Sequence, residues 1–247
     1  MMHIDINCDI GEGIGNEELL VPFISSANIA CGFHASDENE MKRMVALCLQ
    51  YGVAIGAHPS FPDRENFGRA AMNLTAQKIQ QLIKEQLKAL NKIVLAAGGR
   101  MHHVKPHGAL YNMAAKDTLL AMSVAEAVKD FDDSLIYYGL SGSVMIDEAV
   151  ESGLRIAHEA FADRTYQPDG SLTPRTYPGS LITDAGQVIA QVMQMIDKKM
   201  VTATNGEHIS IQADTICIHG DGSNAVEFLK KINDSLLAGG ILIKKIE

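Results

Sequence analysis

Six apolar segments of this chain each end abruptly in polar side chains, and this repetition constrains the fold more than any other feature. The segments have the length and composition of buried strands, and each ends at or just before a His, Asp, Glu, Lys or Arg. They cover residues 3–9, 27–34, 53–58, 104–112, 156–161 and 215–219. A fold that gathers the carboxyl ends of its strands at one place accounts for all six.

Strand and helix patterns alternate along the chain, which favours a parallel sheet, either closed or doubly wound. We expect seven strand–helix units, and a length of 247 residues suits one α/β domain spanning residues 1–247. The expected central strands are 4–8, 28–31, 53–57, 103–106, 135–139, 155–160 and 215–219. The expected helices are 38–51, 75–97, 117–129, 141–151, 184–200 and 224–238.

Several shorter segments complete this prediction. Residues 207–211 alternate like an extra strand in a hairpin, and residues 241–243 suggest a terminal strand. Residues 21–24 suggest a helical turn, and the segment after Gly108 has the composition to open a helix. Two long loops, 58–71 and 163–180, follow predicted strands, and loops of that length in a compact domain are usually functional.

Bulk composition narrows the class of protein. A hydrophobic content of 47% and a charged content of 21% are ordinary for a soluble globular protein. The net charge of −9 argues against nucleic-acid binding, which needs a basic surface. No basic-then-apolar leader and no apolar stretch long enough for a membrane span are evident, so a cytoplasmic protein is expected. Its cysteines, expected as buried reduced thiols, are Cys8, Cys31, Cys48 and Cys217.

Histidines recur at the predicted strand exits. A single histidine in such a place is more often a hydrogen-bonded structural residue, but four at equivalent positions are harder to explain in that way. Together with Asp9, these histidines could form a metal site whose ligands come from separate strands. His102 and His103 precede the core of their strand and are left out. The four histidines at strand exits are His34, His58, His107 and His219.

Asp5, Asn7 and Asp9 alternate by two along the first predicted strand, so their side chains point to the same face. Three polar groups on an inward face are costly to bury unless they are paired or bind something. They therefore form either a satisfied polar network at the mouth of a barrel or an anchor for a substrate or metal.

Charged side chains at other strand ends suit an anionic ligand. Lys105 follows the fourth predicted strand, and Glu159, Asp163 and Arg164 follow the sixth. Lys and Arg among carboxylates can hold a phosphate or a substrate carboxylate, although Arg164 in a solvated ion pair is the simpler alternative. The sequence contains no P-loop, and the glycine-rich turn 11–15 does not complete a dinucleotide fingerprint.

Six longer blocks of sequence resemble the LamB/YcsF family, in the same order and nearly from end to end. They are DINCDIGE at 5–12, SSANIACGFHA at 25–35, GAHPSFPD at 56–63, VKPHGALYN at 104–112, EAFADRTYQPDGSL at 159–172 and HGD at 219–221. Two positions depart from the family pattern: the block FGRAAM at 67–72 lacks a second Arg, and Ser36 stands where Gly is expected.

The resemblance implies a (β/α)7 TIM-like barrel of the glycoside hydrolase/deacetylase type. It also implies one component, the A chain, of an ATP-dependent 5-oxoprolinase, a hydrolase that converts 5-oxo-L-proline to L-glutamate with hydrolysis of ATP. Two partner subunits, B and C, are implied as well, and Mg²⁺ is expected with the nucleotide. A homo-oligomer is left open.

On the basis of this resemblance, we assign roles to the polar residues at the strand ends. Lys105 and Arg164 would hold phosphate, and Asp9, Asp163 or a neutral His107 would orient or deprotonate a nucleophile. Arg64 or Arg69 would hold the substrate carboxylate. The remaining expected substrate contacts are Asp5, Asn7, His34, His58, Glu159, His219 and Asp221.

Two other functions stay open. One is a metal-dependent amidase or deacetylase that needs no ATP, with Asp9, His58 and His107 holding the metal that activates water. The other is a non-catalytic subunit that binds the lactam and presents it to partner chains.

Overall fold

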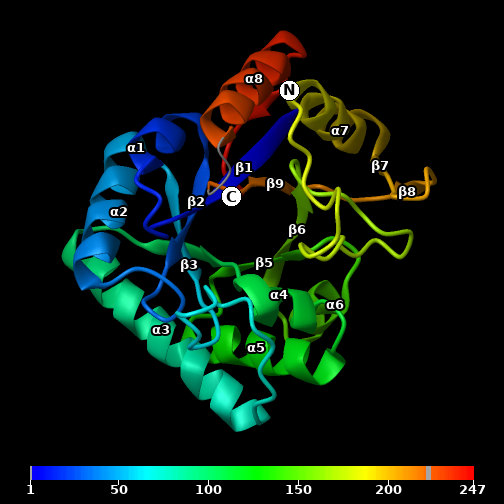
Figure 1. Ribbon diagram of the computed structural model, residues 1–247. Coiled ribbons are helices and arrows are strands. Elements are labelled where there is room, and N and C mark those ends of the chain that lie inside the picture. The colour runs from blue at the N-terminus through cyan, green and yellow to red at the C-terminus, as the bar shows by residue number, and fades with distance from the viewer. Residues whose placement is uncertain (1, 221–223) are drawn as a thin grey trace.

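The computed structural model describes residues 2–220 and 224–247, and its centre is a closed barrel of parallel strands (Figure 1). Each strand pairs with the next along the chain, and β9 closes the ring by pairing with both β6 and β1. The barrel strands are β1 (His3–Ile10), β2 (Ser26–Ala30), β3 (Ala54–His58), β4 (Met101–Val104), β5 (Ile136–Leu140), β6 (Arg155–Phe161) and β9 (Thr215–Ile218). The predicted parallel barrel of seven strands is confirmed.

Helices surround the barrel on its outer side (Figure 1). They are α1 (Glu17–Leu20), the 3₁₀ turn η1 (Val21–Phe23), α2 (Glu38–Tyr51), α3 (Ala76–Ala96), α4 (Gly108–Ala114), α5 (Thr118–Phe131), α6 (Val144–Glu151), α7 (Ala185–Lys198) and α8 (Ala225–Ala238). Along residues 2–220 and 224–247, none of these helices is long and apolar enough to cross a membrane.

Local chemistry explains where the helices start. The side chain of Asp37 accepts hydrogen bonds from the backbone N–H groups of Asn39 and Glu40 and so caps α2. Thr75 caps α3 in the same way through the N–H of Lys78. The helix α4 confirms the expectation of a helix at Gly108, and only three residues separate it from the end of β4.

The remaining strands lie outside the ring. The expected hairpin forms between β7 (Met200–Thr202) and β8 (His208–Ser210), which pair antiparallel, so α7 ends two residues before the predicted limit. The expected terminal strand is β10 (Leu242–Ile243), which adds in parallel beside the start of β1.

The two faces of the barrel strands carry different chemistry. In β1, the apolar residues Ile4, Ile6 and Ile10 belong to the hydrophobic core, whereas Asp5 and Asn7 are buried in a network of polar side chains. The larger apolar core therefore lies between the strands and the helices, and the inside of the barrel is lined with hydrogen-bonding groups.

The polar interior is hydrogen-bonded rather than unsatisfied. Asp5 accepts hydrogen bonds from the hydroxyls of Ser25, Ser26, Tyr138 and Thr215, at 2.6–3.1 Å. Burial raises the pKa of Asp5 above its usual value, and these donors offset part of that effect. Such pairing is what makes a buried polar network tolerable.

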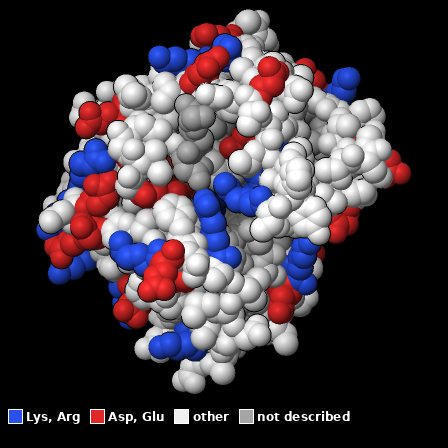
Figure 2. Space-filling model, in the orientation of Figure 1, with Lys and Arg blue, Asp and Glu red and all other residues white. Residues whose placement is uncertain are grey.

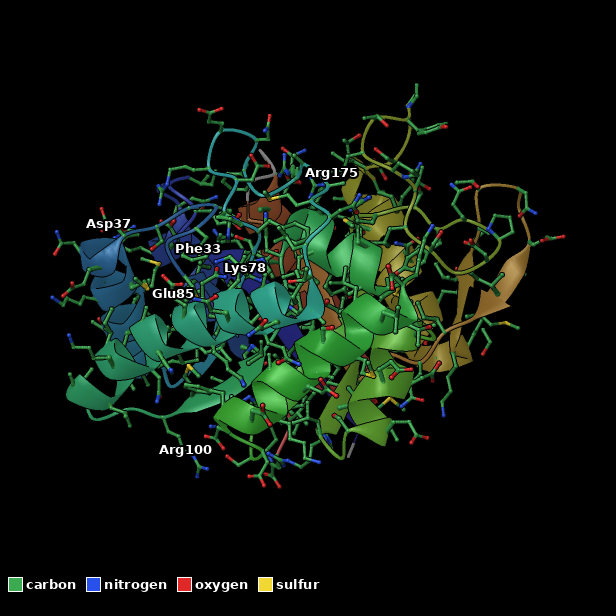
Figure 3. All side chains as sticks on the ribbon, turned by 90° about the horizontal axis from the view of Figure 1, so that it is seen from below. Phe33, Asp37, Lys78, Glu85, Arg100 and Arg175 are labelled. Atoms are coloured by element: carbon green, nitrogen blue, oxygen red, sulfur yellow. The ribbon has the colours of Figure 1, made fainter. Side chains whose placement is uncertain are left out.

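Parallel strands bring all their carboxyl ends to one end of the barrel, where the two long loops also lie. These loops connect β3 to α3 and β6 to α7. Arg175, in the second loop, and Arg100, just before β4, mark the opposite ends of the barrel in Figure 3. The end that carries Arg175 is where barrel enzymes place their active sites.

Candidate active site

A pocket of about 470 Å³ opens at the carboxyl ends of the barrel strands. Seen from this end, Figure 2 shows basic side chains gathered around a hollow at the centre of the molecule. The predicted site residues that line the pocket are Asp9, His58, Arg69, Lys105, His107, Arg164 and His219. Residues from five of the six predicted strand exits thus meet in one place, and His34, from the sixth, stacks on His107 beside them.

Lys105 occupies the floor of the pocket and is almost fully buried. Its Nζ lies 2.9 Å from Asp9 Oδ1 and 2.9 Å from Glu159 Oε1, and it also donates to Cys217 Sγ at 3.0 Å. Burial acts to lower the pKa of Lys105, but the surrounding Asp9, Cys217 and Glu159 raise it well above the usual value. Lys105 is therefore a positive charge already balanced by two carboxylates.

Asp9 stays ionised because positive charge lies next to its carboxylate. Burial alone would raise its pKa, yet His58 and Lys105 hold the pKa well below 3.8. Asn28 Nδ2 also donates to Asp9 Oδ1 at 2.8 Å, so both Lys105 and Asn28 lie on the same carboxylate oxygen. The other oxygen, Oδ2, faces His58 Nε2 at 3.3 Å.

Three histidines form a compact cluster at one side of the pocket. The rings of His34 and His107 stack with their centroids 3.8 Å apart, and His107 Nδ1 lies 2.9 Å from His58 Nε2. Glu12 Oε1 lies 3.0 Å from His34 Nε2 and 3.4 Å from His107 Nδ1. Burial and the nearby His58 lower the pKa of His34 to about 2, and the pKa of His107 falls well below 6.5 for the same causes.

These distances define which described residues could hold a metal. Glu12, His34, His58 and His107 offer ligand atoms that all lie within 4.8 Å of one another. Two of them, His58 and His107, belong to the predicted metal set. The third predicted ligand, Asp9, reaches this cluster through His58 and also falls in a second group with Cys217 and His219.

The site also contains a carboxylate–histidine pair and a buried arginine. Asp163 accepts from His219 Nδ1 at 3.0 Å and from the His219 backbone N–H at 3.2 Å. Burial acts to raise the pKa of Asp163, but His219 and Arg164 together lower it. Arg164 donates to the carbonyl oxygens of Thr173 and Ser180. Burial and the neighbouring Arg175 lower the pKa of Arg164 to about 10.

Several predicted contacts lie elsewhere. Asp5, Asn7 and Glu159 are buried beneath the pocket and support it from below; Asn7 Nδ2, for example, donates to Glu159 at 3.0 Å. Arg64 is exposed and donates to the carbonyl oxygens of Gly32 and Ser36, so it ties two loops together outside the pocket lining. Asp221 lies outside the described residues.

Sequence reasoning missed four residues that matter to the geometry. Glu12 lines the pocket and joins the histidine cluster, and Tyr111 donates to Glu159 Oε2 at 2.7 Å. Arg175 reaches the pocket from the second long loop. His103, which we set aside, lies inside the barrel and contacts Asn28 Oδ1 at 2.8 Å. The signal for His103 was available, since it precedes Lys105 by two residues on the same strand face.

Fold and site together define a barrel protein whose pocket combines ionised carboxylates, neutral imidazoles and arginines at the catalytic end of the strands. Residues 4–247 match the sequence model of the LamB/YcsF family. The chain is 50% identical over 246 residues to the A subunit of 5-oxoprolinase from Bordetella parapertussis, covering 98% of each sequence. It is also 50% identical to the corresponding 5-oxoprolinase subunit of Shouchella clausii, covering 99% of this chain and 98% of the relative.

A solved structure agrees with this assignment. The lactam utilization protein from Thermus thermophilus matches with a TM-score of 0.93 and 39% sequence identity, over 99% of this chain and all of the other. The chain therefore belongs to the LamB/YcsF family, and the resemblance drawn from its sequence blocks is confirmed.

Proposed function

We propose that this chain is the A subunit of an ATP-dependent 5-oxoprolinase and that its pocket opens the ring of 5-oxo-L-proline to give L-glutamate. The names of its relatives support the lactam as substrate. The observation that carries the proposal is the pocket itself, which places the ionised Asp9 next to a histidine cluster that contains the neutral His107, within a ring of cationic side chains.

ATP is needed because a five-membered lactam is a stable amide. In the proposed reaction, the γ-phosphoryl group of ATP is transferred to the lactam oxygen, and ADP leaves. Water then adds to the activated carbon, and the C–N bond breaks with protonation of the nitrogen to give γ-glutamyl phosphate. Hydrolysis of that acyl phosphate releases phosphate and L-glutamate.

The cations of the pocket divide into two kinds under this proposal. Lys105 is balanced by Asp9 and Glu159, so it fixes the Asp9 carboxylate instead of binding phosphate as the sequence suggested. Arg164 and Arg175 line the pocket together and are better placed to bind the phosphoryl group. Burial and the neighbouring Arg175 lower the pKa of Arg164, so its guanidinium gains most from an anion. Arg69, on the other long loop, is our candidate for the substrate carboxylate.

The carboxylate and the histidines serve the attacking water. Asp9 Oδ2 is the oxygen that faces the histidine cluster, and it would orient the water that adds to the ring carbon. His107 is neutral at pH 7 because burial and the nearby His58 keep its pKa low, so its ring offers a lone pair beside Asp9. His219, held by Asp163, lines the same pocket and would protonate the departing nitrogen.

Under this proposal, the partner chains bind the nucleotide. The sequence carries no P-loop, so we propose that subunits B and C bring ATP with Mg²⁺ to the lactam. The test is the purified chain mixed with both partners, followed for ADP and glutamate with and without 5-oxo-L-proline. Equal amounts of ADP and glutamate, formed only with the lactam present, are expected. Glutamate formed without ADP would refute the coupling.

The histidine cluster favours a second candidate, a metal-dependent amidase that needs no ATP. Under this alternative, the chain alone would cleave 5-oxo-L-proline or N-acyl amino acids, and a chelator would stop the reaction. Turnover that requires both ATP and the partners would exclude it.

A further inference from the structure

The hydrogen bonds around the histidine cluster fix where each ring carries its proton. His58 Nδ1 lies 2.7 Å from the carbonyl oxygen of Lys105, and His107 Nε2 lies 2.9 Å from the carbonyl oxygen of Phe67. A carbonyl oxygen only accepts, so each of these outer nitrogens must carry the hydrogen. When these rings are neutral, their inner nitrogens, His58 Nε2 and His107 Nδ1, therefore carry lone pairs and no hydrogen.

The position of the hydrogen on His34 is fixed in the same way, through the hydroxyl of Ser60. The Ser60 hydroxyl donates to the carbonyl oxygen of Phe61 at 2.9 Å, so its oxygen is left to accept from His34 Nδ1 at 2.8 Å. The inner nitrogen, His34 Nε2, is then a lone pair as well, and it faces Glu12 Oε1 at 3.0 Å. When all three rings are neutral, each of them therefore turns a lone pair toward the same carboxylate.

This arrangement gathers acceptors around a common point. The inner nitrogens of His58 and His107 are 2.9 Å apart, and Glu12 Oε1 lies 3.4 Å from His107 Nδ1 and 3.9 Å from His58 Nε2. Asp9 adds a second carboxylate oxygen, 3.3 Å from His58. Lone pairs and anionic oxygens at such distances in a buried site repel one another unless a cation lies between them.

The backbone is shaped to hold the rings in this orientation. Phe67, whose carbonyl orients His107, has a φ of 56°, which is strained for a bulky residue. A Cβ on the next residue, Gly68, would lie 2.9 Å from atoms of both His34 and His107, so any residue other than glycine would collide with these two histidines. Outer hydrogen bonds that fix imidazole tautomers are typical of metal sites.

We propose that Glu12, His34, His58 and His107 bind one divalent transition-metal ion, with Asp9 Oδ2 beside it. Three imidazoles and a carboxylate suit zinc and its neighbours in the first transition row. The site differs from the predicted Asp9, His58 and His107 by taking Glu12 and His34 as ligands. Bound there, such an ion supplies Lewis-acid polarisation of a carbonyl oxygen. The site stands on its own geometry, whereas its use in lactam opening rests on the proposed function.

The experiment measures binding, so it does not depend on activity. The purified full-length chain is stripped with a chelator and titrated with Zn²⁺ alone, with bound metal measured by mass spectrometry and stability by thermal unfolding. One ion per chain and a raised Tm are expected. The variants Glu12→Gln and His34→Asn should each weaken binding by more than the roughly 10–100-fold expected for losing an outer partner. The exposed residues Glu65 and His208 provide matched controls, Glu65→Gln and His208→Asn, that should bind normally.

Two results would overturn the proposal. One is a stripped wild-type chain that takes up no Zn²⁺ and shows ring ¹⁵N resonances of a protonated His58, which would make the central cation a proton. The other is unchanged Zn²⁺ affinity in folded Glu12→Gln and His34→Asn. Should both variants misfold, Co²⁺ bound to the wild-type chain decides: histidine-ligated absorption bands are expected, and their absence contradicts the site. Metal binding without glutamate formation would support the metal site and refute only its role in opening the lactam.

Discussion

Replacing Lys105 by Met tests the charge network that holds the floor of the pocket. The Lys105 Nζ lies 2.9 Å from both Asp9 and Glu159, and all three side chains are buried. Met keeps the length of the side chain but leaves two buried carboxylates without their cation. Breaking a buried pair in this way costs about 3–5 kcal/mol of unfolding free energy. For a chain of this size, that corresponds to a fall in Tm of about 6–20 °C.

The same variant should show a distinct pH dependence. In the wild-type chain, His58 and Lys105 hold the folded pKa of Asp9 below 3.8, so Asp9 contributes stability above about pH 4 and loses it as the pH falls. Without Lys105, burial raises the pKa of Asp9, and protonation in mild acid relieves the unpaired charge. The difference between the two proteins should therefore be larger at about pH 8 than at about pH 5.

Denaturant unfolding at both pH values measures these differences, and Lys88→Met on the exposed face of α3 serves as the control. The control should change stability by less than about 0.5 kcal/mol. A loss below about 1 kcal/mol for Lys105→Met, or a loss equal at both pH values, would refute the account of a buried, balanced charge network.

Three further substitutions test single features. Ser36 has a φ of 73°, so Ser36→Gly should raise the unfolding free energy by up to about 1 kcal/mol; a destabilised variant would contradict that strain. Tyr111→Phe removes the hydroxyl that donates to Glu159 and should cost about 1–3 kcal/mol in denaturant unfolding, and no loss would mean that the bond is unimportant. Gly68→Ala should shift the NMR signals of the His107 ring at a stability cost of about 1–3 kcal/mol, and an undisturbed ring would show that the site tolerates a Cβ.

The barrel could be predicted because its signal is local. Apolar strands and amphipathic helices alternate along most of the chain, and capping residues such as Asp37 and Thr75 stand where the helices begin. The short helix α4 could be suspected only from its composition, since it follows β4 so closely that no separate pattern develops.

The site was only partly predictable because depth within a barrel leaves no trace in the sequence. The alternation of Asp5, Asn7 and Asp9 places all three side chains inside, but only the closed structure shows that Asp9 reaches the pocket while Asp5 supports it from below. Glu12 lies in a turn beyond the strand, where no periodicity applies. Arg175 reaches the pocket through the path of a long loop, which local patterns do not determine.

The most direct test of the central claim is glutamate formation by the chain with its B and C partners, comparing wild type with Asp9→Asn. Asn keeps the size of the side chain at the point where Lys105, Asn28 and His58 converge but removes its charge. We predict that the wild-type assembly forms glutamate and ADP in equal amounts, whereas the folded Asp9→Asn assembly forms almost no glutamate. Full glutamate formation by Asp9→Asn would place the opening of the lactam outside this pocket.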